Sequence, residues 1–102
     1  MAALTTKADR AMLRAVLAGA RKAGLRVPVG ITLKVVPCLP RNRAQTTGRT
    51  ITVERGELTY DLLCHEVAHV LIDQLVEHHD ANDHNRFWAL CYGTLYQNAV
   101  QR

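Results

Sequence analysis

The chain has 102 residues, of which 48% are hydrophobic and 22% charged, and its formal net charge is +4. These values predict a single globular domain over residues 1–102, because they suit one modest core and fit neither disorder nor low complexity. No apolar run reaches the ~18–20 residues of a membrane span, so we expect no membrane partner. Charges interrupt the N-terminal apolar stretch, which is therefore not expected to be a signal peptide. The three cysteines match no disulfide framework, and we expect a cytoplasmic protein.

Residues 5–23 are predicted to form the first helix, because apolar residues recur there at helical spacing and Gly24 suits its C-terminal cap. Residues 1–26 contain six basic residues and one acidic residue. Four of the basic residues share one stripe of this helix, which predicts either a solvated face or a patch for nucleic acid or an acidic partner. These four are Lys7, Arg10, Arg14 and Arg21.

Two strands are predicted next, at residues 31–36 and 50–53, where β-branched residues dominate. The connection between them, residues 37–49, is polar and long for a structureless loop, so it is expected to contain a short strand or to carry function. Arg55 and Gly56 are typical of a turn.

Two further helices are predicted, over residues 60–79 with Thr59 as N-cap and over residues 84–99. Apolar residues at helical spacing predict a buried stripe on the last helix, formed by Phe87, Leu90, Cys91 and Leu95. A neighbouring stripe carries Trp88, Tyr92 and Tyr96. The expected order is α-β-β-α-α, an α+β fold with a small two- to three-stranded sheet.

All five histidines of the chain lie within residues 65–84, and the first two belong to the motif His65-Glu66-x-x-His69. On a helix, residues i and i+4 share one face, so the two imidazoles can bind one zinc ion. Glu66 is offset by about 100° and lies beside the metal, where it can deprotonate a zinc-activated water. Two solvated surface histidines are the alternative, but the apolar flanking residues predict a mostly buried helix, where such a cluster without a metal is costly.

A catalytic zinc ion needs a third protein ligand and an open position. The two adjacent histidines after the motif would lie about 13–15 Å beyond His69 on a continuous helix, too far for the same ion. His84 follows a turn and can fold back over the site. Two aspartates can also return, but their alternative role as turn and cap residues is strong. The residues considered for the third ligand are thus His78, His79, Asp80, Asp83 and His84, of which His78 and His79 can reach the ion only if the helix breaks early.

The motif HEVAH at residues 65–69, followed by HNRFW at residues 84–88, resembles the small zinc metallopeptidases of the YgjP, SprT and WLM type. The resemblance covers about residues 50–96. It implies a minimal zincin-like fold with an N-terminal helix, a small sheet, an HExxH helix and a C-terminal helix. It also implies that the strand at residues 50–53 is the edge strand beside which substrate lies.

The same resemblance implies that His65, His69 and His84 bind one zinc ion per chain. Glu66 is then the general base of a hydrolase that cleaves peptides or proteins. Asp73, one turn beyond His69, suits either a role in orienting a ligand histidine or a solvated carboxylate. Oxyanion stabilisation stays open among four residues, Tyr92, Tyr96, His78 and His79.

Two other functions stay open. A zinc-stabilised binding module would use the basic N-terminal helix for nucleic acid or an acidic partner, and an inactive hydrolase would keep the fold alone. Glu66 favours the peptidase, because a structural zinc site has no use for a carboxylate beside the metal. Cys38 is the residue that can close the fourth position, and such a ligand would favour the structural interpretation.

Overall fold

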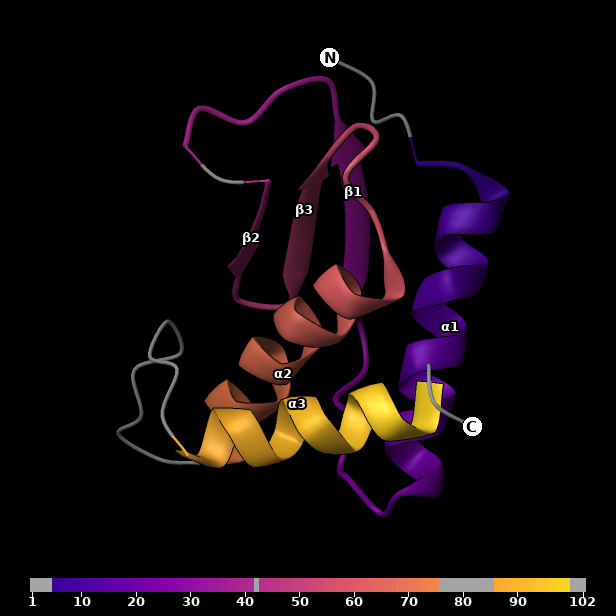
Figure 1. Ribbon diagram of the computed structural model, residues 1–102, viewed down its shortest axis with the longest axis vertical. Helices are drawn as coiled ribbons and strands as arrows, with labels where there is room; N and C mark the ends of the chain where they lie inside the picture. The colour runs from indigo at the N-terminus through magenta and orange to yellow at the C-terminus, as the bar shows by residue number, and fades with distance from the viewer. Residues whose placement is uncertain (1–4, 42, 76–85, 100–102) are drawn as a thin grey trace.

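The computed structural model describes residues 5–41, 43–75 and 86–99. Within these ranges the chain forms a layer of helices against one three-stranded sheet (Figure 1). The elements are α1 (Lys7–Lys22), β1 (Thr32–Val36), β2 (Ala44–Thr47), β3 (Thr50–Glu54), α2 (Tyr60–Leu75) and α3 (Arg86–Ala99). None of the described helices combines the length and the apolarity that a membrane crossing requires. The α+β class is confirmed, and the finer zincin-like identity stays a prediction.

Helix α1 is closed at both ends by local interactions. The Asp9 N–H donates to the Thr6 hydroxyl at 3.1 Å, and the Thr6 N–H donates to the Asp9 carboxylate at 2.9 Å. This capping box satisfies amide groups that a helix N-terminus leaves open. At the other end Gly24 has a φ of +86°, and the Leu25 N–H donates to the Ala20 carbonyl. The predicted glycine cap is therefore confirmed.

The sheet has the order β1-β3-β2, with β3 parallel to β1 and antiparallel to β2. The predicted extra strand within residues 37–49 is confirmed as β2. A two-residue turn, Gly48-Arg49, joins β2 to β3. Because β3 pairs with β1 on one side and with β2 on the other, residues 50–53 lie in the centre of the sheet. The expectation that they form the edge strand is wrong, and the edge strand that packs against α2 is β2.

One face of the sheet is covered and the other is polar. On β1 the side chains of Leu33 and Val35 are buried, whereas those of Thr32 and Lys34 are exposed. Helices α1 and α2 cover the apolar face, and α3 packs against both of them (Figure 1). Helix α2 is thus held by the sheet, by α1 and by α3. The largest fully buried side chains include Val16, Ile51, Val53, Leu63, Leu71 and Leu95.

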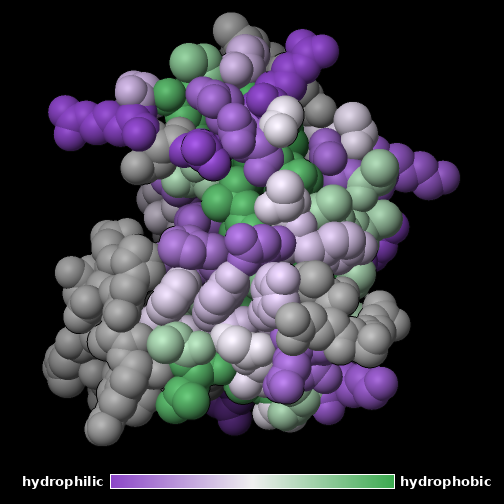
Figure 2. Space-filling view, in the orientation of Figure 1, coloured by the Kyte–Doolittle hydropathy of each residue, from purple (hydrophilic) through white to green (hydrophobic). Residues whose placement is uncertain are grey.

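The predicted buried stripe on α3 is partly wrong. Cys91 and Leu95 are buried, but Leu90 is 70% exposed, and the side chain of Phe87 lies outside the described part of the structure. The face of α3 that meets α1 and α2 carries Cys91, Leu95 and the half-buried Trp88, and Leu90 points about 100° away from Cys91. Figure 2 shows apolar atoms at the surface in the lower part of the molecule, where α3 runs.

Candidate active site

The motif lies within the first three turns of α2, close to its capped end. The Leu62 N–H donates to the Thr59 hydroxyl at 3.0 Å, which confirms Thr59 as the N-cap. The helix then buries Leu63 and Val67 completely in the core. Because Leu63 and Val67 point into the core, the neighbouring positions direct Glu66 toward β2 and direct His65 and His69 toward α3.

The two histidines of the motif lie side by side, as their spacing predicts. Their ring centroids are 5.1 Å apart, with the ring planes inclined by 69°. The Nε2 atom of His65 lies 3.6 Å from the Oε2 atom of Glu66. His65 is about one third exposed, whereas Glu66 and His69 are each only 6% exposed. Two imidazoles and one carboxylate are therefore brought together at a place that solvent reaches through His65.

Glu66 has a partner that the sequence did not reveal. The hydroxyl of Thr46, on β2, donates a hydrogen bond to Oε1 of Glu66 at 2.7 Å. Thr46 faces α2 because side chains alternate along β2, where Gln45 and Thr47 are exposed. The pairing of β2 with β3 creates this contact, and the polar segment around Thr46 gave only a weak strand signal.

Helix α3 supplies an aromatic wall beside the histidines. The centroid of the Trp88 ring lies 4.8 Å from that of His65 and 5.6 Å from that of His69. Tyr92 stacks on Trp88 at 5.1 Å, with the planes inclined by 6°. The Tyr92 hydroxyl donates to the Asp61 carboxylate, and this bond, with a smaller contribution from burial, raises the pKa of Tyr92 to about 12. The phenol is therefore protonated at neutral pH.

A hollow of about 260 Å³ opens beside His65. Its lining includes Arg43, Glu57, Asp61 and Tyr92, and the first two form an ion pair at 3.8 Å. Such an exposed pair contributes little to stability. The hollow leaves room for a small bound group next to the motif.

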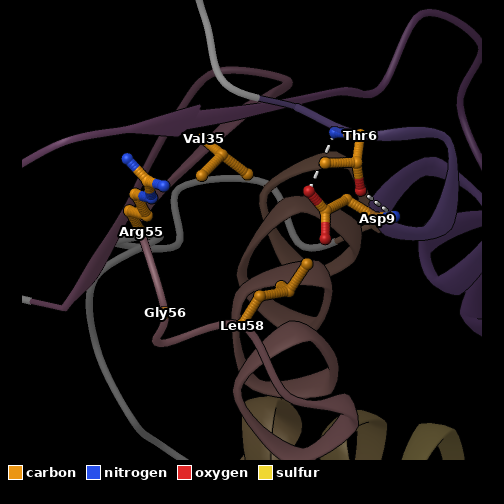
Figure 3. Close-up of a pocket in the computed structure, with 6 residues that line it drawn as sticks. All are labelled: Thr6, Asp9, Val35, Arg55, Gly56 and Leu58. Carbon is orange, nitrogen blue, oxygen red and sulfur yellow. Dashed lines mark hydrogen bonds between the residues drawn. The ribbon is translucent and has the colours of Figure 1, made fainter.

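A second hollow, of about 360 Å³, lies at the start of α1 and is lined by Thr6, Asp9, Val35, Arg55, Gly56 and Leu58 (Figure 3). Figure 3 shows the Thr6 and Asp9 side chains directed at one another in the capping box. The Asp9 carboxylate is therefore already engaged, and the lining includes neither histidine nor cysteine.

Cys64, which precedes the motif on α2, and Cys91, on α3, are core residues. Cys64 and Cys91 are free and buried. Burial raises the pKa of the Cys64 thiol to about 12, with smaller contributions from Asp61 and Cys91. Burial raises the pKa of the Cys91 thiol to about 11. Both are protonated at neutral pH and act as small apolar side chains.

Part of the predicted site falls outside the residues that the structure describes. His84 and the side chain of Asp73 lie outside the described part of the structure. In the ranges that are described, no three side chains of His, Cys, Asp or Glu gather as a metal site would require. Cys38 is exposed and does not join the histidine pair. The other candidates that lie outside the described residues are His78, His79, Asp80 and Asp83.

Comparisons of the chain with protein-family models, with curated proteins and with solved structures find no match. The resemblance to zinc metallopeptidases therefore rests on the motif residues of the sequence alone.

Proposed function

We propose that the chain is a zinc-dependent metallopeptidase in which Glu66 is the general base. The observation that carries the proposal is the grouping of His65, His69 and Glu66 on α2, with Oε2 of Glu66 3.6 Å from Nε2 of His65. In a hydrolytic H-E-x-x-H site the glutamate beside the metal ligands serves as general base, whereas a structural zinc site has no use for it.

The donor set suits zinc as far as it is described. His65 and His69 would provide two nitrogen ligands, and we propose His84 as the third. Trp88 contacts both histidine rings and lies four residues after His84 in the sequence. Four residues of chain span at most ~14 Å, a length that would allow His84 to reach the pair. A zinc ion bound there supplies Lewis acidity, which lowers the pKa of a water molecule toward neutrality and polarises a carbonyl group.

Glu66 is suited to move the proton that hydrolysis requires. Its carboxylate is almost fully buried, so few solvent molecules compete for it. Thr46 holds Oε1, and Oε2 faces Nε2 of His65. The carboxylate can accept a proton from the attacking water and pass it to the departing amine.

Strand β2 offers a place for an extended substrate. The Glu54 N–H donates to the Arg43 carbonyl at 2.8 Å. Because bonding alternates along an antiparallel pair, the backbone groups of Ala44 and Thr46 face away from β3. Among the described strands, none pairs with this side of β2. A peptide added there would pass beside Glu66, since the Thr46 side chain contacts that residue.

The test uses the intact protein loaded with zinc and a peptide library analysed by mass spectrometry. Glu66→Gln should retain the metal, measured by elemental analysis, and lose hydrolysis by about 10²–10⁴-fold, the usual contribution of a general base. Glu54→Gln makes the same chemical change on the far face of the sheet and should leave the rate unchanged. If the wild-type protein shows no zinc-dependent cleavage, the proposal is wrong.

The alternative of a nucleic-acid-binding module is favoured by the exposure of all four cations on the stripe of α1. Fluorescence anisotropy with a labelled duplex would show binding that weakens as salt rises. Replacing Arg10 and Arg14 by Gln should weaken that binding, whereas replacing Lys34 and Arg41 serves as the matched control. Absence of binding at low salt would remove this alternative.

A further inference from the structure

We propose that Thr46 is a positioning residue for the catalytic base, an inference that rests on the proposed peptidase function. Its hydroxyl lies 2.7 Å from Oε1 of Glu66 and 3.5 Å from the Glu66 backbone carbonyl oxygen. A threonine hydroxyl has one proton, and the shorter distance assigns that proton to Oε1. The carboxylate on α2 is thus held by a side chain twenty residues earlier in the chain.

Because of the hydrogen bond from Thr46, the two carboxylate oxygens of Glu66 have different roles. Glu66 is 6% exposed, and a buried carboxylate needs hydrogen-bond donors to offset its lost hydration. Thr46 meets that need at Oε1 and, in doing so, fixes the rotation of the carboxylate. Oε2 is then left facing Nε2 of His65 at 3.6 Å, on the side where the proton must be transferred. The flexible glutamate side chain would otherwise populate several orientations.

Thr46 is itself held by the sheet. It lies opposite Ile51, a fully buried residue of the central strand, and the neighbouring pairs Gln45–Thr52 and Thr47–Thr50 continue the ladder on both sides. A group placed on a paired strand is more precisely located than one on a loop. The main chain of the same residue faces the open edge of β2. The strand that would receive the substrate therefore also orients the base, and the hydroxyl of Thr46 itself touches no reacting atom.

The test compares three variants of the zinc-loaded chain. Thr46→Val keeps the shape of the side chain and removes the hydroxyl, and we expect kcat to fall by about 10–100-fold with KM within about twofold, as for loss of one hydrogen bond to a charged group. Thr46→Ser restores the hydroxyl and should recover kcat to within about threefold of the wild type. Thr47→Val, whose side chain is exposed on the opposite face of the strand, should leave both constants unchanged.

Crystal structures of the two Thr46 variants give a readout that does not depend on activity. Oε2 of Glu66 should move away from His65 in Thr46→Val and keep its place in Thr46→Ser. If the wild type cleaves peptides and Thr46→Val keeps its kcat, this inference alone is overturned. If Thr46→Val loses zinc or stability and serine does not rescue kcat, the role of Thr46 is structural and the inference fails. If the wild type cleaves nothing, the peptidase proposal fails and the role of Thr46 fails with it.

Discussion

The indole N–H of Trp88 donates a hydrogen bond to the backbone carbonyl of His65 across 3.3 Å, and the two rings meet edge to face with centroids 4.8 Å apart. Helix α3 is therefore attached to α2 at the motif itself. Trp88 contacts both the main chain and the side chain of His65, so a substitution of Trp88 should disturb the position of His65 in the motif.

Replacing Trp88 by Phe keeps an aromatic ring and removes the donor. We expect the free energy of unfolding to fall by about 1–2 kcal/mol, from the lost hydrogen bond and the smaller ring. Urea denaturation monitored by circular dichroism measures the change. Leu90→Ala on the same helix is the control, and because Leu90 is 70% exposed the effect should stay within about 0.5 kcal/mol. Equal losses in the two variants would contradict the anchoring role of Trp88.

The assignment of His84 as third ligand is testable by metal content alone. The wild type should bind about one zinc ion per chain, and His84→Ala, His65→Ala and His69→Ala should each lose it. His78→Ala and His79→Ala should keep full occupancy, because a continuous helix would place both residues roughly 13–15 Å beyond His69. Elemental analysis after dialysis gives the stoichiometry. Full zinc content in His84→Ala would show that another residue completes the site.

The three cysteines should differ sharply in reactivity. With pKa values of about 12 and 11, the buried thiols of Cys64 and Cys91 hold almost no thiolate at pH 8. We expect one fast equivalent of thiol per chain in a disulfide-exchange assay with the native protein, from the exposed Cys38, and three in denaturant. Cys38→Ser should abolish the fast phase. A second fast equivalent in the native state would contradict the burial of the pair.

The same shifts predict a loss of stability in alkali. Thiols of the unfolded chain ionise near pH 9.0, whereas the folded ones stay protonated until about pH 11–12. The folded state thus binds more protons in that interval, and the free energy of unfolding falls as the pH rises through it.

Replacing two glycines by alanine should change the free energy of unfolding in opposite directions. Gly24 has a φ of +86°, so Gly24→Ala forces a side chain into the left-handed region and should destabilise the fold by about 1 kcal/mol. Gly93 lies inside α3, where an added Cβ meets no atom within 4 Å. Gly93→Ala should stabilise the fold by about 0.5–1 kcal/mol. Thermal unfolding of both variants measures the change in Tm. A change of the same sign in both would contradict the prediction.

Local signals explain which features could be predicted. The Thr59 cap, the Gly24 cap and the i, i+4 placement of His65 and His69 each depend on a few neighbouring residues, and the structure confirms them. Strand β2 was only suspected, because its polar sequence AQTT has no apolar alternation and pairing with β3 defines it.

Contacts between segments that are distant in the chain could not be predicted from the sequence. The Thr46–Glu66 bond joins residues that only the sheet order brings together. The exposure of Leu90 was missed because α3 carries two adjacent apolar stripes, and the face that meets α1 and α2 takes Cys91 and Leu95 from one and Trp88 from the other. His84 stays a prediction.

The central place of β3 also constrains how the sheet assembles. A two-residue turn joins β2 to β3, whereas β1 must pair with β3 in parallel register, with Thr32 beside Thr50. A hairpin of this kind forms in about 1–10 μs, while the parallel pair must first close a longer loop. The β2–β3 hairpin can therefore serve as the early template in folding, with β1 and the helices docking onto it in the slower step.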